Sequence, residues 1–363
     1  MIDRNKLRNI DWILIGLLLV NSFIGVVFIY SSSHYLPGNY CLKQLFWIAI
    51  GLVIIFLFLF VDYHFLVTYS VYIYLFFMLI LMGVLLFGKI TAGTKSWVKL
   101  PLFQFQPSEL AKLSLILILA YVFSRHRRKY LSFGEGITSG TVVLIPVFLI
   151  ILQPDLGTAL TYIPIFLGAI ILAGLNKKTI IFFLIIVILL GLLGWNFVFK
   201  DYQKERLTSF LSPHQDPLDS GYQIQQSRIA IGSGGFLGKG YMKGTQSQLR
   251  FLPARHTDFI FSVIGEEFGF LGVILTLLFY YLFLRRMFQS LSRSRDRVGV
   301  YIIFMVVIMI TSQFFINVMM VIGLIPIVGI PVPLLSYGGS SLLTNYIAVS
   351  LILNVKMRRF VNV

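Results

Sequence analysis

Four long runs of apolar residues constrain this chain more than any other feature of its sequence. They cover residues 13–30, 45–61, 65–87 and 180–198, and none of them contains a charged side chain. A helix needs roughly 20 residues to cross a hydrocarbon layer about 30 Å thick. A soluble domain has about 25% charged residues, whereas this chain of 363 residues has 12% charged and 58% hydrophobic residues. We therefore expect it to cross a membrane several times.

The hydrophobic pattern predicts an all-α integral membrane protein, with about ten transmembrane helices in a single domain that covers residues 1–363. The predicted helices span residues 11–30, 42–61, 65–88, 108–124, 139–152, 156–174, 179–199, 259–284, 298–324 and 337–354. The first apolar run follows basic residues, as in a signal peptide, but no small-x-small cleavage site follows it. We interpret it as an uncleaved first span.

The basic residues indicate which helix ends face the cytoplasm, because short cytoplasmic loops are enriched in Lys and Arg. With the N-terminus inside, the cytoplasmic segments hold Arg4, Lys6, Arg8, Arg125, Arg127, Arg128, Lys129, Lys177, Lys178, Arg285, Arg286, Arg293, Arg295, Arg297, Lys356, Arg358 and Arg359. The short outer loops hold only Lys43, Lys89, Lys95 and Lys99. Both termini are therefore predicted to be cytoplasmic. This topology also explains the net charge of +16 without a nucleic-acid partner.

Metal-binding residues are few. The single cysteine, Cys41, excludes an intramolecular disulfide and any multi-cysteine metal or iron–sulfur site. The five histidines are scattered over both predicted sides of the membrane, and no HExxH motif or Cys/His pairing is present. No cofactor is indicated with certainty. A divalent cation is a possible helper that the sequence neither requires nor excludes.

Residues 200–257 are predicted to form one large extracytoplasmic loop between the seventh and eighth spans. The loop carries twice as many basic as acidic residues, which suits an anionic partner. Its glycines between Gly232 and Gly244 either turn backbone N–H groups toward a phosphate or supply the positive φ angles of a mobile loop. Their spacing is not that of a Walker A loop. The pattern leaves both interpretations open.

Ionisable side chains near hydrocarbon are costly unless they are paired or hydrated, so each one is a candidate functional residue. Glu109 and Lys112 lie three residues apart at the start of the fourth span and share a helix face, as a local ion pair or as ligands. Asp155 precedes the sixth span and Asp258 the eighth. Each is either an anion favoured by the helix dipole or a functional carboxylate.

A stripe of small residues follows Asp258 along one face of the eighth span. It consists of Ser262, Gly265, Gly269 and Gly272. Such a stripe either lets a neighbouring helix approach closely or leaves a groove for an acyl or isoprenoid chain. The sequence does not choose between the two.

Two classes of function fit these features. One is an enzyme at the outer surface that acts on anionic, lipid-linked substrates, and the other is a carrier that moves such a substrate across the bilayer. Carriers hold their decisive charges near the midplane, often where two repeated halves meet. Here the candidate charges cluster toward the outer leaflet and no second half resembles the first, which favours the enzyme. Glu266 and Glu267 lie deeper and keep the carrier open.

Four sequence blocks resemble the SEDS family, the shape, elongation, division and sporulation proteins. The longest reads LPARHTDFIFSVIGEEFGFLG over residues 252–272, and the others are QPSELAK (106–112), QPDLGTA (153–159) and PVPLLSYGGSS (331–341). The order and spacing of the blocks match over nearly the whole chain. The short length, GTQSQ (244–248) and GIPVP (329–333) resemble the elongation member of the family more than the division member.

This resemblance implies a peptidoglycan glycosyltransferase of the plasma membrane that polymerises lipid II into β-1,4 glycan strands at the outer face during cell elongation. The implied partners are a class B penicillin-binding protein and other membrane proteins of the elongation complex. By the same resemblance, Asp258 matches the essential carboxylate of the family. The paired charges of the fourth span, the tryptophan of the preceding outer loop and the acid of the Gln-Pro-Asp block are matched by Glu109, Lys112, Trp97 and Asp155.

The implied reaction requires only one carboxylate. Lipid II has an α-linked muramyl pyrophosphate and the polymer has β-1,4 bonds, so transfer with one inversion needs a base for the sugar 4-hydroxyl. An inverting glycosidase also needs an acid for its leaving group, whereas pyrophosphate leaves as a stable anion. Cations or helix-start amides stabilise that anion; the candidate cations are Lys112, Arg228, Lys239 and Arg255. The alternative function is a carrier or flippase for the lipid-linked precursor.

Overall fold

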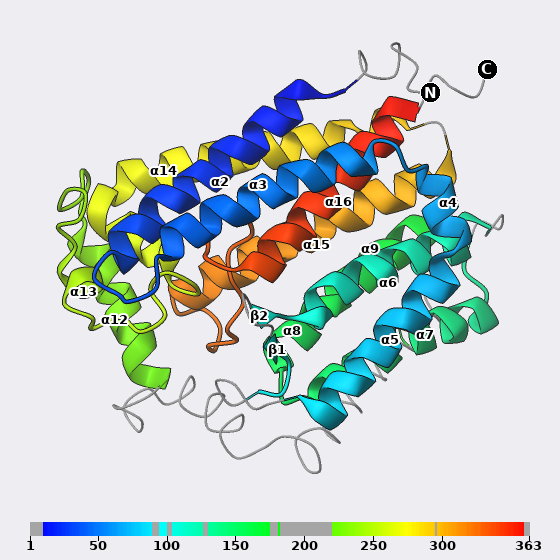
Figure 1. The fold of residues 1–363 in the computed structure, drawn as a ribbon, viewed down its shortest axis with the longest axis horizontal. Helices are drawn as coiled ribbons and strands as arrows, with labels where there is room; N and C mark the ends of the chain where they lie inside the picture. The colour runs from blue at the N-terminus through cyan, green and yellow to red at the C-terminus, as the bar shows by residue number, and fades with distance from the viewer. Residues whose placement is uncertain are drawn as a thin grey trace.

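The computed structural model describes residues 10–88, 94–99, 104–125, 130–174, 181, 220–294 and 296–358, which form a bundle of long helices (Figure 1). The helices are α2 (Trp12–Ser33), α3 (Tyr40–Phe58), α4 (Tyr63–Thr68), α5 (Ser70–Phe87), α6 (Pro107–Ser124), α7 (Phe133–Leu152), α8 (Leu156–Leu160), α9 (Tyr162–Ala173), α12 (Ser220–Ser233), α13 (Thr245–Gln248), α14 (Ile260–Gln289), the 3₁₀ helix η3 (Leu291–Arg293), α15 (Arg297–Val321) and α16 (Gly339–Arg358). In these ranges the only strands are β1 (Val98–Lys99) and β2 (Gln104–Phe105), paired antiparallel. The predicted all-α class is confirmed.

Eight helical stretches in the described part are long and apolar enough to cross a membrane. They are α2, α3, α5, α6, α7, α8 with α9, α14 and α15. Helix α16 occupies the place of the tenth predicted span but is not among these eight. The seventh predicted span, residues 179–199, lies outside the described residues except for Ile181, and so do residues 200–219 of the predicted outer loop.

Helix α7 begins at Phe133 rather than at residue 139, where the hydrophobic pattern places its start. The cause is a capping box: the Glu135 amide donates to Ser132 Oγ, and the Ser132 amide donates to the Glu135 carboxylate. This reciprocal pair satisfies two backbone donors that a helix start otherwise leaves open. The helix therefore gains more than a turn of polar, glycine-containing sequence before its apolar span.

The core of the bundle is built around α6. In the 18-residue apolar stretch of α6, 78% of the residues are buried, against 22% in the corresponding stretch of α3. Helix α6 packs against α5, α9, α15 and α16. Large apolar side chains such as Phe87 and Leu79 are exposed on the surface of the bundle, as expected of a protein whose surroundings are hydrocarbon rather than water.

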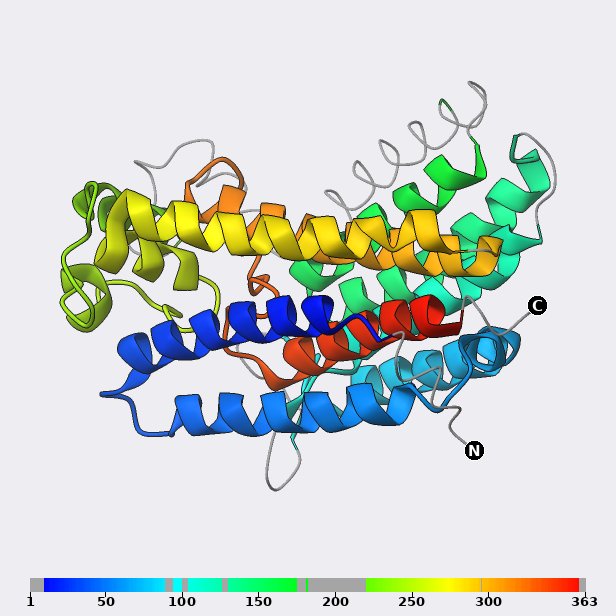
Figure 2. The same ribbon diagram turned by 90° about the horizontal axis from the view of Figure 1, so that it is seen from above.

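A glycine-rich loop, residues 234–244, gathers with α12 and α13 at one end of the bundle (Figure 2). Helix α14 is interrupted beside this loop at Gly269, which has φ 60°. The interruption releases backbone groups of α14, and the loop binds them: the Phe270 amide donates to Gly235 O at 2.9 Å and the Gly240 amide donates to Glu267 O at 2.9 Å. The glycines therefore allow direct contact between the loop backbone and α14.

The stripe of small residues on α14 accommodates neighbouring protein segments. Ser262 Oγ lies 2.8 Å from Ser227 Oγ of α12. A Cβ added to Gly265 would lie 3.2 Å from Ile231 of the same helix. Of the two interpretations of this stripe, the contacts of Ser262, Gly265 and Gly269 support close approach of protein segments.

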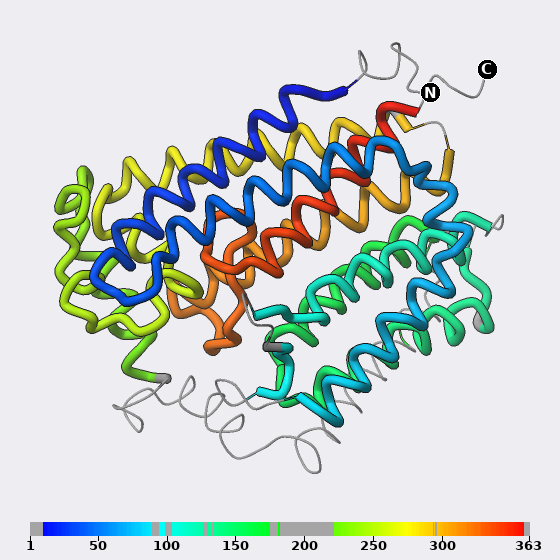
Figure 3. The backbone as a smooth tube through the Cα atoms, viewed as in Figure 1, coloured from blue at the N-terminus to red at the C-terminus, as the bar shows by residue number. Residues whose placement is uncertain are grey.

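The connection between α15 and α16, residues 322–338, runs inward from the end of α15 (Figure 3). It lies between the start of α14 and the starts of α6 and α8. A Cβ on Gly157, the second residue of α8, would collide with the Val328 carbonyl oxygen. Directly after the connection, Ser340 Oγ in the first turn of α16 accepts the Gln106 amide, just before α6, at 2.9 Å. This connection thus joins the helix starts at which several candidate residues lie.

The other end of the bundle is held by two ionic networks. In the first, the buried Asp11 carboxylate accepts hydrogen bonds from Arg286 (Nε–Oδ2 2.8 Å) and from Lys356 Nζ. The start of α2 therefore meets the ends of α14 and α16. This contact places the first and the last helix ends on one side of the bundle, which agrees with the predicted topology.

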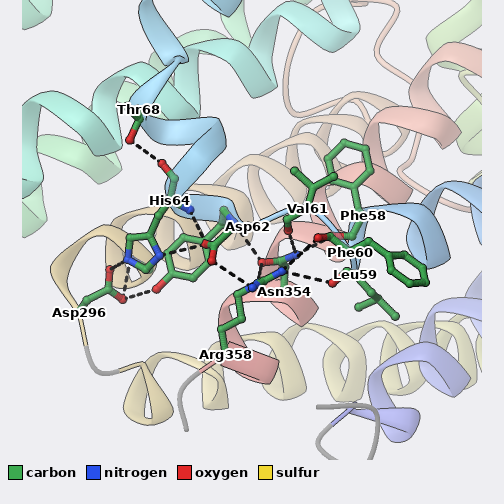
Figure 4. Close-up of polar contacts among 12 residues, drawn as sticks. Phe58, Leu59, Phe60, Val61, Asp62, His64, Thr68, Asp296, Asn354 and Arg358 are labelled. Atoms are coloured by element: carbon green, nitrogen blue, oxygen red, sulfur yellow. Dashed lines mark hydrogen bonds and ion pairs between the residues drawn. The ribbon is translucent and has the colours of Figure 1, made fainter. Parts of the chain in front are cut away.

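The second network fastens the turn between α3 and α4 to α15 and α16 (Figure 4). The His64 ring lies between the carboxylates of Asp62 and Asp296, with nitrogen–oxygen distances of 3.1 and 3.3 Å. Arg358 Nη1 donates to Asp62 Oδ2 at 3.0 Å. Asn354 Nδ2 donates to two carbonyls of the turn. These contacts lie at the predicted cytoplasmic end, far from the glycine-rich loop.

Candidate functional site

Asp258 lies in a tight turn immediately before α14, at the end of the bundle that holds α12 and α13. The amides of Thr257 and Phe259 both donate to Ala254 O, at 3.1 and 3.3 Å. Ala254 has a φ of 46°, a left-handed conformation that closes the turn. The Asp258 side chain is half-buried. The carboxylate is thus held on a short, hydrogen-bonded turn at the predicted outer end of a membrane helix.

Three consecutive carbonyl groups before α14 each accept a hydrogen bond from the region of α15 and its connection to α16. The bonds are Tyr337 N to His256 O (2.9 Å), Ser336 Oγ to Thr257 O (2.5 Å) and Asn317 Nδ2 to Asp258 O (2.7 Å). A segment with three successive external donors has little freedom to rotate its peptide groups. The backbone that carries Asp258 is therefore fixed by a part of the chain distant in sequence.

Gly329, in the same connection, lies beside the Asp258 carboxylate. Its φ is 67°, and a Cβ added there would lie 3.7 Å from Asp258 Oδ2. Asn317 Nδ2 also donates to the carbonyl oxygen of Ile330, the residue after Gly329, at 2.7 Å. The backbone at Gly329 and Ile330 thus forms one wall of the carboxylate's surroundings.

His256 is two residues from Asp258 and is packed among aromatic rings. Its ring centroid lies 4.6 Å from that of Tyr40 and 5.9 Å from that of Tyr337. Burial, and then the positive charge of Arg255, lower the pKa of His256 from 6.5 to about 4. The ring is therefore neutral at neutral pH and does not add positive charge beside the carboxylate.

Glu109 and Lys112 form an ion pair inside the bundle, near the start of α6. Lys112 Nζ lies 2.7 Å from Glu109 Oε1, and the two side chains are 0% and 8% exposed. Pairing is how charges are tolerated in such surroundings. The contact supports the ion-pair interpretation, and the role of Lys112 as a pyrophosphate ligand stays a prediction.

Asp155 has two kinds of partner at the start of α8. Its Oδ1 accepts the Thr158 amide at 3.1 Å, as an N-cap does. Its Oδ2 accepts Gln106 Nε2 at 2.8 Å. Gln106 also donates to Thr158 Oγ1 at 3.2 Å. The carboxylate therefore both begins its own helix and binds the segment that begins α6.

Trp97 lies half-buried just before β1, in the short segment that precedes α6 and is predicted to be outside. The same segment is attached to the turn before α8, because the Lys95 amide donates to Gln153 O at 3.2 Å. This places the segment of Trp97 next to the Gln-Pro-Asp turn of Asp155.

The remaining basic candidates have different surroundings. Lys239 Nζ lies 2.8 Å from the buried Glu266 Oε1 and donates to Thr245 Oγ1. Arg255 is 4% exposed and its Nε donates to Ser32 O at 2.6 Å. Arg228 is exposed on α12. Lys239 and Arg255 therefore bind protein groups, while the Arg228 guanidinium remains at the surface.

Two of the predicted carboxylates lie near one backbone segment, residues 328–329. A Cβ added to Gly157, two residues after Asp155, would collide with Val328 O, and a Cβ added to Gly329 would lie 3.7 Å from Asp258 Oδ2. Asn317 and Gly329 were not predicted from the sequence as site residues. Asn317 is a buried amide in a span of mostly apolar residues, and that position is the signal that could have identified it.

No cluster of three His, Cys, Asp or Glu side chains that could hold a metal ion occurs among the residues that the structure describes. The possible role of a divalent cation stays open.

The fold and the site define a class: a polytopic helical membrane protein with a carboxylate at the predicted outer end of one span, held by the connection between two later helices. The model of the FtsW/RodA/SpoVE family, described as cell cycle proteins, matches residues 11–360. The chain belongs to this family.

Curated relatives carry the names of peptidoglycan glycosyltransferases. RodA of Treponema pallidum is 35% identical, with 96% of this chain and 98% of the relative covered. MrdB of Escherichia coli K12 is 36% identical, covering 86% and 84%, and a probable FtsW of Geobacter sp. strain M18 is 37% identical, covering 97% and 98%. The predicted family and its enzyme class, peptidoglycan glycosyltransferase, are confirmed.

Two solved structures are similar over almost the full length. RodA of Thermus thermophilus is 27% identical with a TM-score of 0.72, and 97% of this chain and 98% of that chain are covered. A chain from a study of polymerization and crosslinking by a peptidoglycan synthase complex is 30% identical, with a TM-score of 0.82 and the same coverage. The helical architecture is therefore that of this family.

Proposed function

We propose that this protein polymerises lipid II into β-1,4 glycan strands at the outer face of the plasma membrane, with Asp258 as the general base. The observation that carries the proposal is the Asp258 carboxylate on a fixed turn at the predicted outer end of α14, beside the backbone of Gly329. A base fixed in this way can take the proton from an incoming sugar hydroxyl without first having to be ordered.

The glycosyl transfer also requires stabilisation of the negative charge on the leaving pyrophosphate. The proton moves from the sugar 4-hydroxyl to Asp258, the new bond forms from that oxygen to C1, and the bond from C1 to the phosphate oxygen breaks with its electrons. Arg228 is the candidate cation with the most accessible side chain, on α12. Lys112, Lys239 and Arg255 each have a protein partner, and their proposed contacts with substrate, like those of Trp97, Glu109 and Asp155, require a direct test.

A role in cell elongation, with a class B penicillin-binding protein as partner, is the finer part of the proposal. The relatives named RodA and MrdB support it, as does the similar chain from a peptidoglycan synthase complex. Relatives named FtsW and stage V sporulation protein E are similar to nearly the same degree. The elongation role therefore rests mainly on the GTQSQ and GIPVP runs.

Glu266 and Glu267, whose deeper position kept the carrier alternative open, have partners within the protein. Glu266 accepts the amides of Gln246 and Ser247, at 2.8 and 3.0 Å. Glu267 accepts hydrogen bonds from Ser31 and from Gln248. Both carboxylates thus fasten the outer segments of the chain to α14 and α2, which is a structural task and does not require a transport path.

The test uses the purified protein with its class B penicillin-binding protein in detergent, supplied with lipid II. A β-lactam blocks the transpeptidase serine of the partner, and glycan length is read on gels. We expect polymer from the wild type in the presence of the β-lactam, and none from Asp258→Ala or from the nearly isosteric Asp258→Asn.

Asp296→Asn is the matched control, because Asp296 also precedes a membrane helix but lies in the cytoplasmic network of His64. It should retain polymerisation. Glycan from Asp258→Asn at near wild-type rate would show that the base is another group. Polymer absent from every sample, together with translocation of labelled lipid II by liposomes that contain the protein, would favour the carrier.

A further inference from the structure

Asn317 holds together the two backbone segments that border the Asp258 carboxylate. It lies near the end of α15 with its side chain 0% exposed. Its Nδ2 donates to Asp258 O and to Ile330 O, each at 2.7 Å. A carboxamide nitrogen carries two hydrogens, so both are used, and both acceptors are carbonyl oxygens. The orientation of the amide is therefore unambiguous.

The hydrogen bond to Asp258 O fills a place that α14 leaves open. The Ser262 amide, which would bind Asp258 O in a continuous helix, donates to Phe259 O instead at 3.0 Å. A buried carbonyl without a partner is costly. Asn317 donates to this carbonyl in place of the Ser262 amide and thereby restrains the Asp258 peptide group, from which the side chain leaves the backbone.

The hydrogen bond to Ile330 O holds the backbone that follows Gly329. A Cβ added to the preceding residue, Gly329, would lie 3.7 Å from Asp258 Oδ2. One side chain thus sets both the position of the carboxylate and that of the backbone facing it.

We propose that Asn317 is a positioning residue for polymerisation. This inference rests on the proposed function of Asp258 as general base. Asn317 acts through Asp258: it touches neither the sugar nor the pyrophosphate, and no proton passes through it. A displacement of about 1 Å of a reacting group can lower a rate by about two orders of magnitude. Loss of Asn317 therefore slows turnover while leaving the binding surfaces for lipid II in place.

A second asparagine offers a matched control. Asn21 of α2 is also 0% exposed, and its Nδ2 donates to the carbonyls of Leu17 and Phe279, at 2.8 and 3.4 Å. In both residues Oδ1 has no hydrogen-bond partner among the described residues. Phe279 lies more than five helical turns along α14 from Asp258. Replacing Asn21 therefore removes a similar pair of bonds without touching the carboxylate.

The experiment compares Asn317→Ala, the milder Asn317→Ser and Asn21→Ala in the complex with the class B penicillin-binding protein. Initial rates of glycan synthesis at varied lipid II give kcat and KM. Hydrogen–deuterium exchange of residues 254–260 and 329–337 reports how firmly these two backbone segments are held. This measurement does not depend on activity. We expect kcat to fall at least about tenfold in Asn317→Ala, less in Asn317→Ser, with KM within about twofold of wild type.

Exchange should rise in both segments for the Asn317 variants only, while Asn21→Ala should retain kcat. An unchanged kcat with faster exchange would overturn the proposal, and so would an equal loss in Asn21→Ala or a rise confined to KM. If Asn317→Ala does not fold, the same criteria apply to Asn317→Ser. Absence of glycan in the wild-type lane would instead refute the proposed function, a result distinct from any difference between variants.

Discussion

The side-chain amide of Gln106 donates to the carboxylate of Asp155 at 2.8 Å, across 49 residues of sequence. Each of these residues stands at the start of a helix that begins at the predicted outer face, in the blocks QPSELAK and QPDLGTA. The similarity of the two blocks is thus accompanied by a direct bond between them. The starts of α6 and α8 are joined side by side, next to the connection that borders Asp258.

Breaking this bond should destabilise the protein modestly. Gln106→Leu removes the donor, and Asp155→Asn keeps an N-cap while removing the charge. We expect each change to lower the free energy of unfolding by about 1 kcal/mol, and the double change to cost less than the sum. Thermal unfolding in detergent gives the stabilities of the wild type, the two single variants and the double variant. Additive losses would mean that the two side chains act independently.

The ion pair of Glu109 and Lys112 gives a stronger expectation. Changing one partner leaves the other charged and uncompensated inside the bundle, so Glu109→Gln or Lys112→Met alone should cost about 3 kcal/mol. The double variant should cost less than the two single changes together. The same four proteins are then assayed for glycan synthesis. A double variant that is stable but inactive would assign this pair a further role with the substrate.

The sequence predicts the features of this fold that depend on local pattern. The apolar spans are readable because hydrocarbon requires long uninterrupted helices, and Glu109 pairs with Lys112 because residues three apart share a helix face. The early start of α7 was also encoded, in the Ser132–Glu135 capping box, but glycines and polar residues hide it from a hydrophobicity scan. These features need only a few neighbouring residues.

Features that depend on distant contacts were not predictable. Lys239 was a candidate ligand by its charge, and only the folded chain places it on Glu266. Arg255 likewise donates to the carbonyl of Ser32, far away in sequence. Asn317 was not predicted as a site residue because its side chain is a neutral amide, whereas the cost of burial near hydrocarbon singles out ionisable side chains. Its importance depends on which carbonyl groups the fold leaves without donors.

Replacing Gly329 tests whether the backbone beside the Asp258 carboxylate affects the reaction. Gly329→Ala places a methyl group 3.7 Å from Asp258 Oδ2 and forces a left-handed conformation on an alanine, which costs roughly 1–2 kcal/mol. We expect slower glycan synthesis together with a small loss of thermal stability. Gly235→Ala is the control: it has a φ of 57° and no atom within 4 Å of the added Cβ. Equal rates in the two variants would argue against a role for this wall.

His256 predicts a pH dependence of stability. The folded ring takes up a proton only near pH 4, whereas the unfolded chain does so near pH 6.5. Between these values the unfolded state binds more protons, so stability falls as the pH falls, by at most about 1.4 kcal/mol per pH unit from this group. His256→Phe keeps a ring between Tyr40 and Tyr337 and removes the titration. Its melting temperature should fall less than that of wild type between pH 6.5 and pH 4.5. Parallel curves would contradict the assignment.

The contacts of Asp11 also bear on how the protein is made. The chain is synthesised from its N-terminus, yet the partners of Asp11 lie 275 residues further on, at Arg286, and 345 residues further on, at Lys356. The carboxylate, at the predicted cytoplasmic end of the bundle, can therefore meet these partners only after the intervening helices have been synthesised. Its two cations follow one another in the sequence, since Arg286 belongs to α14 and Lys356 to α16. A chain that stops before Lys356 would lack one of the two cations beside Asp11, so full fastening of α2 requires a residue 345 positions further along the sequence.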